Sequence, residues 1–374
     1  MFNRLPISIN NYYGDPTMQW GNTIDKVSRL NRDGHIGPVA VILKGMVTFS
    51  MAQELKANSG GLKLVVLVSI SNMPMHIEPV PRETRYSSMK NLVNVGIPTL
   101  GYFRPLTGTD DIESILINIK KSGIDNIIVS GFRGDKELAD RMDMKDFSIR
   151  VKKMPRAVKD MVNKISSDIG IRVFDRTACG CAYVLGMERS WNPYQSTPHM
   201  AGCLSCPLKE TCFDVPVEPT KESLEFVRSL GFDLEFIKEE RPELCTINPD
   251  NRTACPSCCT TCWILKRSRV NVNGKVNLGV LAYLRFLLGG ILVSSNGIMD
   301  DGSTTVGHVN FPRFKIPWEI HALNTWVPIA SEVKRCFGCA YCIAEHYDNE
   351  LKEYGCYPSD LERWVKERIK NEKK

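Results

Sequence analysis

The residues best suited to chemistry lie near the end of the sequence, where Cys336, Cys339 and Cys342 fall within seven residues. A turn this tight can direct three thiolates to one point and leave a fourth metal position to another ligand. Thiolate-rich sites are typical of iron–sulfur clusters or zinc, and a cluster held by three cysteines keeps one iron open to a small molecule. The spacing also allows a closed structural site, completed by Cys356 or a distant cysteine.

The other cysteines indicate further metal sites. The chain has 14 cysteines in 374 residues, and none lies in the first 178. We expect no secretory segment, so we interpret the cysteine clusters as metal ligands in the reducing cytoplasm rather than as disulfides. Six histidines without zinc-finger spacing favour iron–sulfur, although all-cysteine zinc stays open. The expected ligands outside the first group are Cys179, Cys181, Cys203, Cys206, Cys212, Cys245, Cys255, Cys258, Cys259 and Cys262.

The composition is that of an ordinary globular protein, with 43% hydrophobic and 24% charged residues. The net charge is +6, but the basic residues are scattered, and a solvated helix end explains the basic run at 366–374 more simply than nucleic-acid contact. No apolar run reaches the ~18 residues that a membrane span needs, so we expect no membrane partner.

The first 175 residues alternate short β-rich runs with amphipathic helical stretches, which predicts a parallel sheet covered by helices. Such repeats build either a barrel or an open doubly wound sheet. We expect strands at Pro6–Asn10, Val39–Leu43, Leu62–Ile70, Pro98–Phe103, Asp125–Gly131 and Ile171–Phe174. We expect helices at Trp20–Leu30, Ser50–Ala57, Glu83–Val95, Asp110–Lys121 and Arg156–Ser167.

The motifs that follow these strands resemble those of radical S-adenosylmethionine (SAM) enzymes, above all members related to spore photoproduct lyase. The resemblance rests on Ser69–Ser71, the Glu-Pro turn at Ile77–Pro79, Arg85 and Gly96–Pro98. Upstream, Tyr13–Pro16 stands where the family has a Gly-Gly-Glu-Pro-like motif, with Asp in place of Glu. The resemblance covers residues 5–135, about a third of the chain.

The family's first strand and cysteine loop are expected before Leu5, but matching residues occur instead at the end of the chain. Thr325–Ile329 reads as a strand, and Cys336, Cys339 and Cys342 follow it. The resemblance therefore implies an α/β fold, a partial (β/α)6 radical SAM-type barrel that is circularly permuted and carries an inserted cysteine-rich auxiliary cluster domain. The expected domains are a barrel at 1–175, the auxiliary domain at 176–322, and the permuted strand, cluster loop and helices at 323–374.

Two cysteine triplets compete for the SAM-binding cluster. The family spacing is C-x3-C-x2-C, whereas Cys336, Cys339 and Cys342 are spaced C-x2-C-x2-C, with the expected aromatic before the last cysteine. The alternative triplet Cys255, Cys259 and Cys262 has the family spacing but lacks the aromatic and a preceding strand.

The middle of the chain resembles the SPASM extension of peptide-modifying radical SAM enzymes at Cys203, Cys206 and Cys212. Cys179 and Cys181 are expected to complete that auxiliary site. A second auxiliary cluster is expected from the five cysteines between 245 and 262, and zinc ribbons are the alternative for both sites. Ser294–Gly302 is predicted to be a polar loop.

The resemblance implies an enzyme that uses [4Fe–4S] clusters, one binding SAM and one or two auxiliary, to cleave SAM reductively to a 5′-deoxyadenosyl radical and abstract a substrate hydrogen. A peptide or protein side chain is the favoured substrate, with nucleic acid possible, and flavodoxin or ferredoxin the expected electron donor. A multi-cluster electron-transfer protein is the non-enzymatic alternative, and a zinc-bearing nucleic-acid module is another. The resemblance matches Gly14, Asp15 and Pro16 to the methionine amino group, Arg85 to the carboxylate, and Ser69, Ser71 and Glu78 to the ribose. Arg85 could instead be a core residue paired with a neighbouring carboxylate.

Overall fold

A computed structural model describes two compact units of this chain, each considered by itself. One comprises Pro6–Ser190 with Pro328–Ser331, and the other comprises Met1–Leu5, Trp191–Val327 and Glu332–Lys374. The residues that the structure describes are 3, 6–9, 15–73, 75–76, 78–106, 111–131, 156–187, 219–229, 232–237, 269–276, 284, 288, 292–298 and 327–328.

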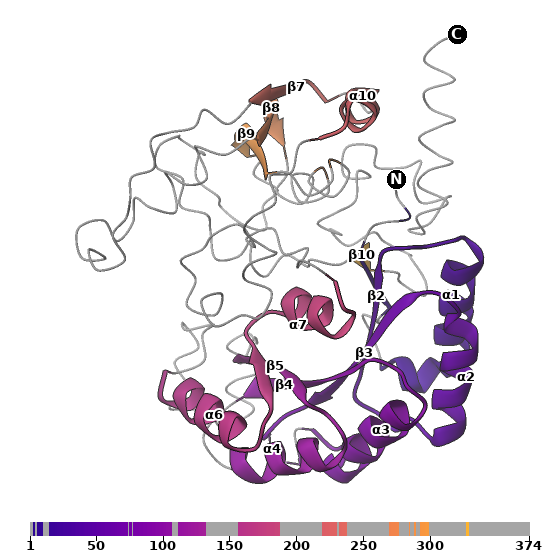
Figure 1. The fold of residues 1–374 in the computed structure, drawn as a ribbon, viewed down its shortest axis with the longest axis vertical. Coiled ribbons are helices and arrows are strands. Elements are labelled where there is room, and N and C mark those ends of the chain that lie inside the picture. The colour runs from indigo at the N-terminus through magenta and orange to yellow at the C-terminus, as the bar shows by residue number, and fades with distance from the viewer. Residues whose placement is uncertain are drawn as a thin grey trace. The chain divides into compact units, whose positions relative to one another are not determined.

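The first unit is built on a seven-stranded sheet with the order β10-β1-β2-β3-β4-β5-β6 (Figure 1). Strands β1 to β6 pair with one another in parallel, which confirms the predicted α/β fold with a parallel sheet. In β3 every residue after Lys63 is buried, because a parallel strand covered on both faces needs a continuous apolar sequence. The strands are β1 (Ile7–Ile9), β2 (Pro38–Leu43), β3 (Lys63–Ile70), β4 (Thr99–Leu106), β5 (Asn126–Gly131), β6 (Arg172–Phe174) and β10 (Val327–Pro328).

Helices connect successive strands, as a parallel sheet requires. Figure 1 shows α1 to α4 and α6 following one another around the outer side of the curved sheet, with α7 on its inner side. In α1, Ile24, Val27 and Leu30 form the buried face that the sequence predicts. The helices are η2 (Pro16–Gln19, a 3-10 helix), α1 (Trp20–Arg32), α2 (Phe49–Ser59), α3 (Arg82–Asn94), α4 (Ile112–Lys121), α6 (Arg156–Asp168) and α7 (Thr177–Val184).

One helix begins later than predicted. Asp110–Lys121 was expected to be helical, but α4 starts at Ile112 because Asp111, its N-cap residue, adopts a left-handed backbone conformation with φ 60°. The Asp111 carboxylate instead forms an ion pair with Arg82 of α3, 2.9 Å away. The acidic side chain therefore links two neighbouring helices in addition to lying near the positive end of α4.

Strand β10, from the end of the chain, lies next to β1 at the edge of the sheet. It falls within the predicted strand Thr325–Ile329, whereas the barrel and its circular permutation stay predictions. The cysteines that follow it, Cys336, Cys339 and Cys342, lie outside the described residues.

The second unit contains a three-stranded sheet of β7 (Leu234–Ile237), β8 (Arg269–Val276) and β9 (Leu292–Ile298), and helix α10 (Lys221–Ser229). The prediction of a loop at Ser294–Gly302 is wrong for Ser294–Ile298, which belongs to β9. This polar segment pairs in parallel with β8. The loop was predicted from its polar side chains, but strand pairing uses backbone groups, which the sequence does not reveal. None of the helices in the described part of the chain combines the length and apolar character needed to cross a membrane.

Candidate functional site

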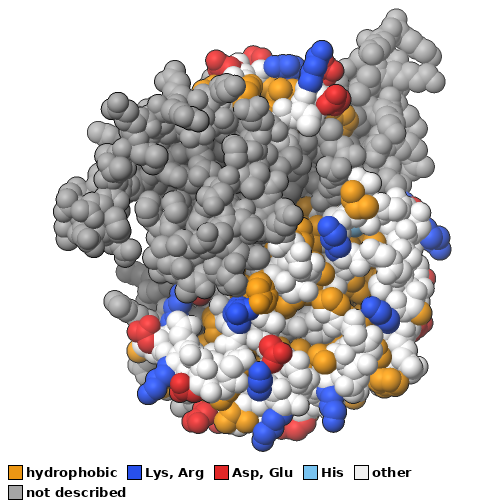
Figure 2. Space-filling model, viewed as in Figure 1, with side chains coloured by type: hydrophobic (Ala, Val, Ile, Leu, Met, Phe, Trp, Pro, Cys, Tyr) orange, Lys and Arg blue, Asp and Glu red, His pale blue; other side chains and the backbone are white. Residues whose placement is uncertain are grey.

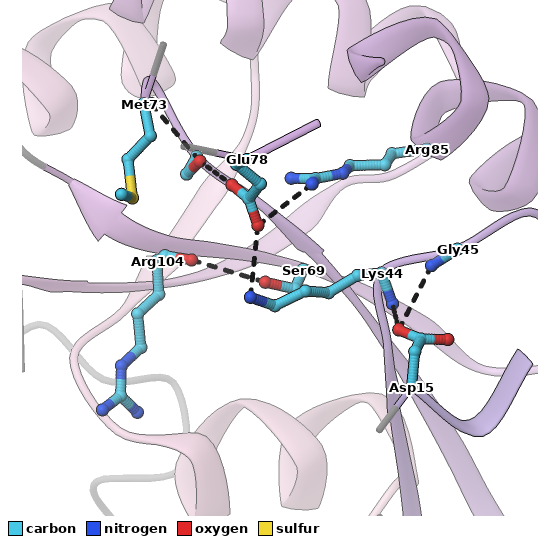
Figure 3. A network of polar contacts seen from close by, with 9 residues as sticks. Asp15, Lys44, Gly45, Ser69, Met73, Glu78, Arg85 and Arg104 are labelled. Carbon is cyan, nitrogen blue, oxygen red and sulfur yellow. Dashed lines mark hydrogen bonds and ion pairs between the residues drawn. The ribbon is translucent and has the colours of Figure 1, made fainter. Parts of the chain in front are cut away.

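The candidate site lies at the carboxyl edge of the parallel sheet, where ligands bind in α/β proteins. Asp15 follows β1, Lys44 and Gly45 follow β2, and Ser71 and Glu78 follow β3. Parallel strands bring these loops to one edge, and the first turn of α3 adds Arg85. Figure 3 shows the side chains of Lys44, Glu78 and Arg85 converging from separate elements.

Glu78 is the centre of the network. Its Oε1 lies 3.0 Å from Nη2 of Arg85 and 3.2 Å from Nζ of Lys44, while its Oε2 accepts a hydrogen bond from the Ser71 hydroxyl. Burial alone would raise the pKa of Glu78, but the neighbouring Arg85 guanidinium, the Ser71 hydroxyl and the Lys44 ammonium together hold the pKa below its ordinary value of 4.5. The carboxylate therefore stays ionised at neutral pH.

The hydrogen bonding at the centre of this network is incomplete. Glu78 Oε1 and the Nε and Nη2 atoms of Arg85 are buried, yet none has a hydrogen-bond partner among the described residues. Nη2 and Oε1 do form an ion pair at 3.0 Å, and Lys44 Nζ lies 3.2 Å from the same oxygen. Arg85 is only 1% exposed. Since buried polar atoms are costly without partners, these atoms suit a ligand that offers both donors and acceptors.

Asp15 has the opposite character, because the chain itself uses both of its carboxylate oxygens. Oδ1 accepts the Thr17 N–H at 2.8 Å and also the Thr17 hydroxyl. Oδ2 accepts the Lys44 N–H and, at 3.2 Å, the Gly45 N–H. Asp15 is therefore the N-cap of η2 and also joins the loop after β1 to the loop after β2.

Helix α3 holds the loop after β2 from the other side. The fully buried Ser88 accepts the Val47 N–H at 2.8 Å, and its single hydroxyl hydrogen has the Thr84 carbonyl at 2.9 Å and the Gly45 carbonyl at 3.2 Å as acceptors. The Asn91 amide donates to the Val47 carbonyl at 2.9 Å. Because α3 also carries Arg85, the same helix contacts the loop after β2 and places Arg85 beside Glu78.

Two other predicted cofactor residues, Ser69 and Pro16, form hydrogen bonds with groups other than Glu78. The Ser69 hydroxyl donates to the Arg104 carbonyl at 3.4 Å, and the Arg104 guanidinium points away from the network toward the Tyr102 hydroxyl, 2.7 Å away (Figure 3). Pro16 is buried at the start of η2, where its carbonyl accepts the Thr23 hydroxyl at 3.1 Å. Gly14 lies outside the described residues. The structure therefore brings together Ser71, Glu78 and Arg85 of the predicted set, joined to Asp15 through Lys44.

Sequence reasoning missed Lys44, although a signal was present. Lys44 directly follows the apolar run of β2, the same relation that drew attention to the polar residues after β3. Its side chain is 53% exposed and its ammonium reaches Glu78, so it is a cation accessible from solvent at the border of a buried site.

Only two of the predicted metal ligands fall within the described residues, and both lie on α7. Cys181 is fully buried against the sheet, and its burial, with the neighbouring Cys179, raises the pKa of its thiol well above the usual value. Residues two apart on a helix face different directions, so α7 does not direct both sulfurs to one point. In the described part of the chain no three His, Cys, Asp or Glu residues are grouped to hold a metal. The ligands outside that part are Cys203, Cys206, Cys212, Cys245, Cys255, Cys258, Cys259, Cys262, Cys336, Cys339 and Cys342.

The described surface in Figure 2 carries Lys and Arg side chains scattered among acidic and apolar ones. On this face the described residues do not form the basic stripe that follows a nucleic-acid backbone. No protein-family model and no curated protein matches this chain. The motifs and the geometry of the charged network are therefore the observations that bear on function.

Proposed function

We propose that the protein is a radical SAM enzyme that binds SAM at the carboxyl edge of its sheet. The observation that carries the proposal is that Glu78 Oε1 and the Nε and Nη2 atoms of Arg85 have no hydrogen bond among the described residues at this edge. Nε and Nη2 lie on one edge of a guanidinium and can hold a carboxylate through two parallel hydrogen bonds. Glu78 Oε1 is an acceptor suited to an ammonium group. The amino-acid end of SAM carries both groups, so its charges match those of this network.

The position of β10 supports the same proposal. A strand from the end of the chain lies beside β1, and the next cysteines after it are Cys336, Cys339 and Cys342. In a permuted radical SAM protein these three residues would hold the [4Fe–4S] cluster and leave one iron for SAM. Their sequence order relative to β10 is that of the family's first strand and cluster loop.

The protein's own part in the reaction is to orient and shield the ligand. When bound, the cluster and SAM supply reductive carbon–sulfur bond cleavage and hydrogen abstraction from a substrate. Arg85 would hold the carboxylate, Glu78 would accept the amino group, and Lys44 would cover the open side with a second positive charge. The SPASM-like cysteine pattern favours a peptide or protein side chain as substrate, with flavodoxin or ferredoxin as electron donor.

The test is anaerobic reconstitution of the full chain, followed by analysis of iron, sulfide and zinc and an assay for 5′-deoxyadenosine. We expect iron above the content of one cubane and SAM cleavage that is lost when Cys336, Cys339 and Cys342 are all replaced by Ala. Cleavage that survives this replacement would transfer the SAM-binding cluster to Cys255, Cys259 and Cys262. Zinc in place of iron, or no cleavage by any iron-loaded preparation, would contradict the proposal.

A further inference from the structure

We infer that Asp15 is a positioning residue and does not bind the cofactor, although it stands where the resemblance expects a ligand for the methionine amino group. Asp15, Thr17, Lys44 and Gly45 form what we term the β1–β2 clasp. The clasp fixes the Lys44 backbone, so that the Lys44 ammonium lies beside Glu78. This inference refines the proposed function, but the clasp itself can be tested without any cofactor.

Asp15 already accepts four hydrogen bonds from the chain itself. Two donors of Thr17 are directed at Oδ1, and the backbone N–H groups of Lys44 and Gly45 are directed at Oδ2. An ionised carboxylate has about four lone-pair sites, and all four are used within the clasp. A ligand ammonium would have to displace one of these bonds, whereas the buried Glu78 Oε1 has ion pairs with Arg85 and Lys44 but no hydrogen bond among the described residues.

Lys44 connects the clasp to the charged network. Its backbone N–H donates to Asp15, and its Nζ lies 3.2 Å from Glu78 Oε1 (Figure 3). A displacement of the Lys44 backbone therefore changes the charge arrangement around Glu78. This link gives Asp15 an effect on ligand binding without a contact to the ligand.

Gly45 fits closely within the clasp. A Cβ atom at Gly45 would overlap the Thr17 hydroxyl oxygen and would lie 3.1 Å from the Thr17 Cβ and 3.3 Å from Asp15 Oδ1. Its φ is not in the left-handed region, so the clasp requires glycine for space and not for backbone conformation. Removing the Thr17 hydroxyl should then make room for a methyl group at 45.

The experiment is hydrogen exchange, resolved to single amides, on the full chain without SAM. In Asp15→Asn an amide NH2 replaces one acceptor oxygen, and we expect the Lys44 and Gly45 amides to exchange at least about tenfold faster, because bonds to a charged group are among the stronger ones. We expect Gly45→Ala to accelerate Lys44 exchange similarly, and Gly45→Ala with Thr17→Ala to return it to the rate of Thr17→Ala alone. Asp25→Asn, at an exposed carboxylate on α1, is the matched control and should change neither amide.

SAM affinity of the iron-loaded variants then separates a positioning role from direct binding. The clasp predicts weaker binding in Asp15→Asn and in Gly45→Ala, with recovery in the double variant. Loss of binding in Asp15→Asn alone, with unchanged exchange at Lys44 and Gly45, would overturn the inference. So would amides of Lys44 and Gly45 that exchange without protection in the unmodified protein. If Asp15→Asn does not fold, the Gly45→Ala pair decides alone. A protein that does not bind SAM refutes the proposed function, while the exchange rates still decide the clasp.

Discussion

The charged network and helix α7 both contain residues that the sequence marks as chemical, but their surroundings differ. In the network, Arg85 and Glu78 are buried together and keep polar atoms without hydrogen bonds among the described residues. On α7, Cys181 is equally buried, but it packs on the helix face that contacts β4, β5 and β6. The buried polar atoms of Arg85 and Glu78 that lack hydrogen bonds among the described residues favour a binding role. The buried thiol of Cys181, in an apolar contact with the sheet, favours a packing role.

The two regions also differ in how their positions are fixed. Polar bonds from separate loops set the network, among them the Asp15 bonds to the loop after β2 and the Ser88 bond to Val47. Close contact sets α7, where a Cβ on Gly180 would lie 2.8 Å from Cγ1 of Ile128 in β5. Removing a partner should therefore be most damaging in the first region, and adding volume most damaging in the second.

The largest effect is expected for Arg85→Met. It removes the buried cation next to Glu78, and breaking a buried ion pair costs about 3–5 kcal/mol because the other charge loses its partner. Reversible denaturation in urea measures the loss. Arg85→Met combined with Glu78→Gln should recover part of it, and a loss below about 1 kcal/mol in the single variant would show that the pair is not an energetic centre.

Matched glycine substitutions test α7, and they should have opposite signs. Gly180→Ala places a methyl group against Ile128 and should destabilise the protein by about 1–3 kcal/mol through overpacking. Gly21→Ala in α1 meets no atom within 4 Å and should stabilise the protein by up to about 1 kcal/mol through helix propensity. Equal effects of the two variants in thermal or urea denaturation would refute a tight contact between α7 and β5.

The sequence was sufficient for the sheet and for part of the site. Strand β3 was predictable from its continuous apolar run, and helix α1 from apolar residues that follow the helical period. Arg85 and Glu78 were both singled out as cofactor residues, which stays a prediction; the structure pairs Arg85 with Glu78, and Arg85 Nε and Nη2 have no hydrogen bond among the described residues. The partners of Asp15 were not predictable, because the Lys44 and Gly45 amides are backbone groups that any residue type supplies.

A further effect is expected from pH. The folded-state pKa of Glu78 is lowered, so its stabilisation is complete above the ordinary value of 4.5 and is lost as the pH falls through the lowered pKa. Glu78→Gln also breaks the buried pair with Arg85, so it should cost about 3–5 kcal/mol from pH 7 down to about pH 5, and the difference from the unmodified protein should narrow at lower pH. Glu83→Gln, at an exposed position of α3, controls for the loss of one charge. A difference that widens in acid would mean that Glu78 is protonated in the folded protein.

The smallest effect is expected for Cys181→Ala, which should leave the iron content of the reconstituted protein unchanged. Cys181 is fully buried, and Cys179, two residues away on the same helix, faces a different direction. The side chain also lies on the buried face of α7, while Cys179 is more exposed. Cys203→Ala is the comparison, since Cys203 belongs to the SPASM-like pattern and its loss should lower the iron content. Alkylation of the folded protein gives a second measurement, in which Cys181 should react at least about tenfold more slowly than Cys179. If Cys181→Ala loses as much iron as Cys203→Ala, Cys181 on α7 is a metal ligand. The buried thiol would then mark a binding site, as the buried charged network does.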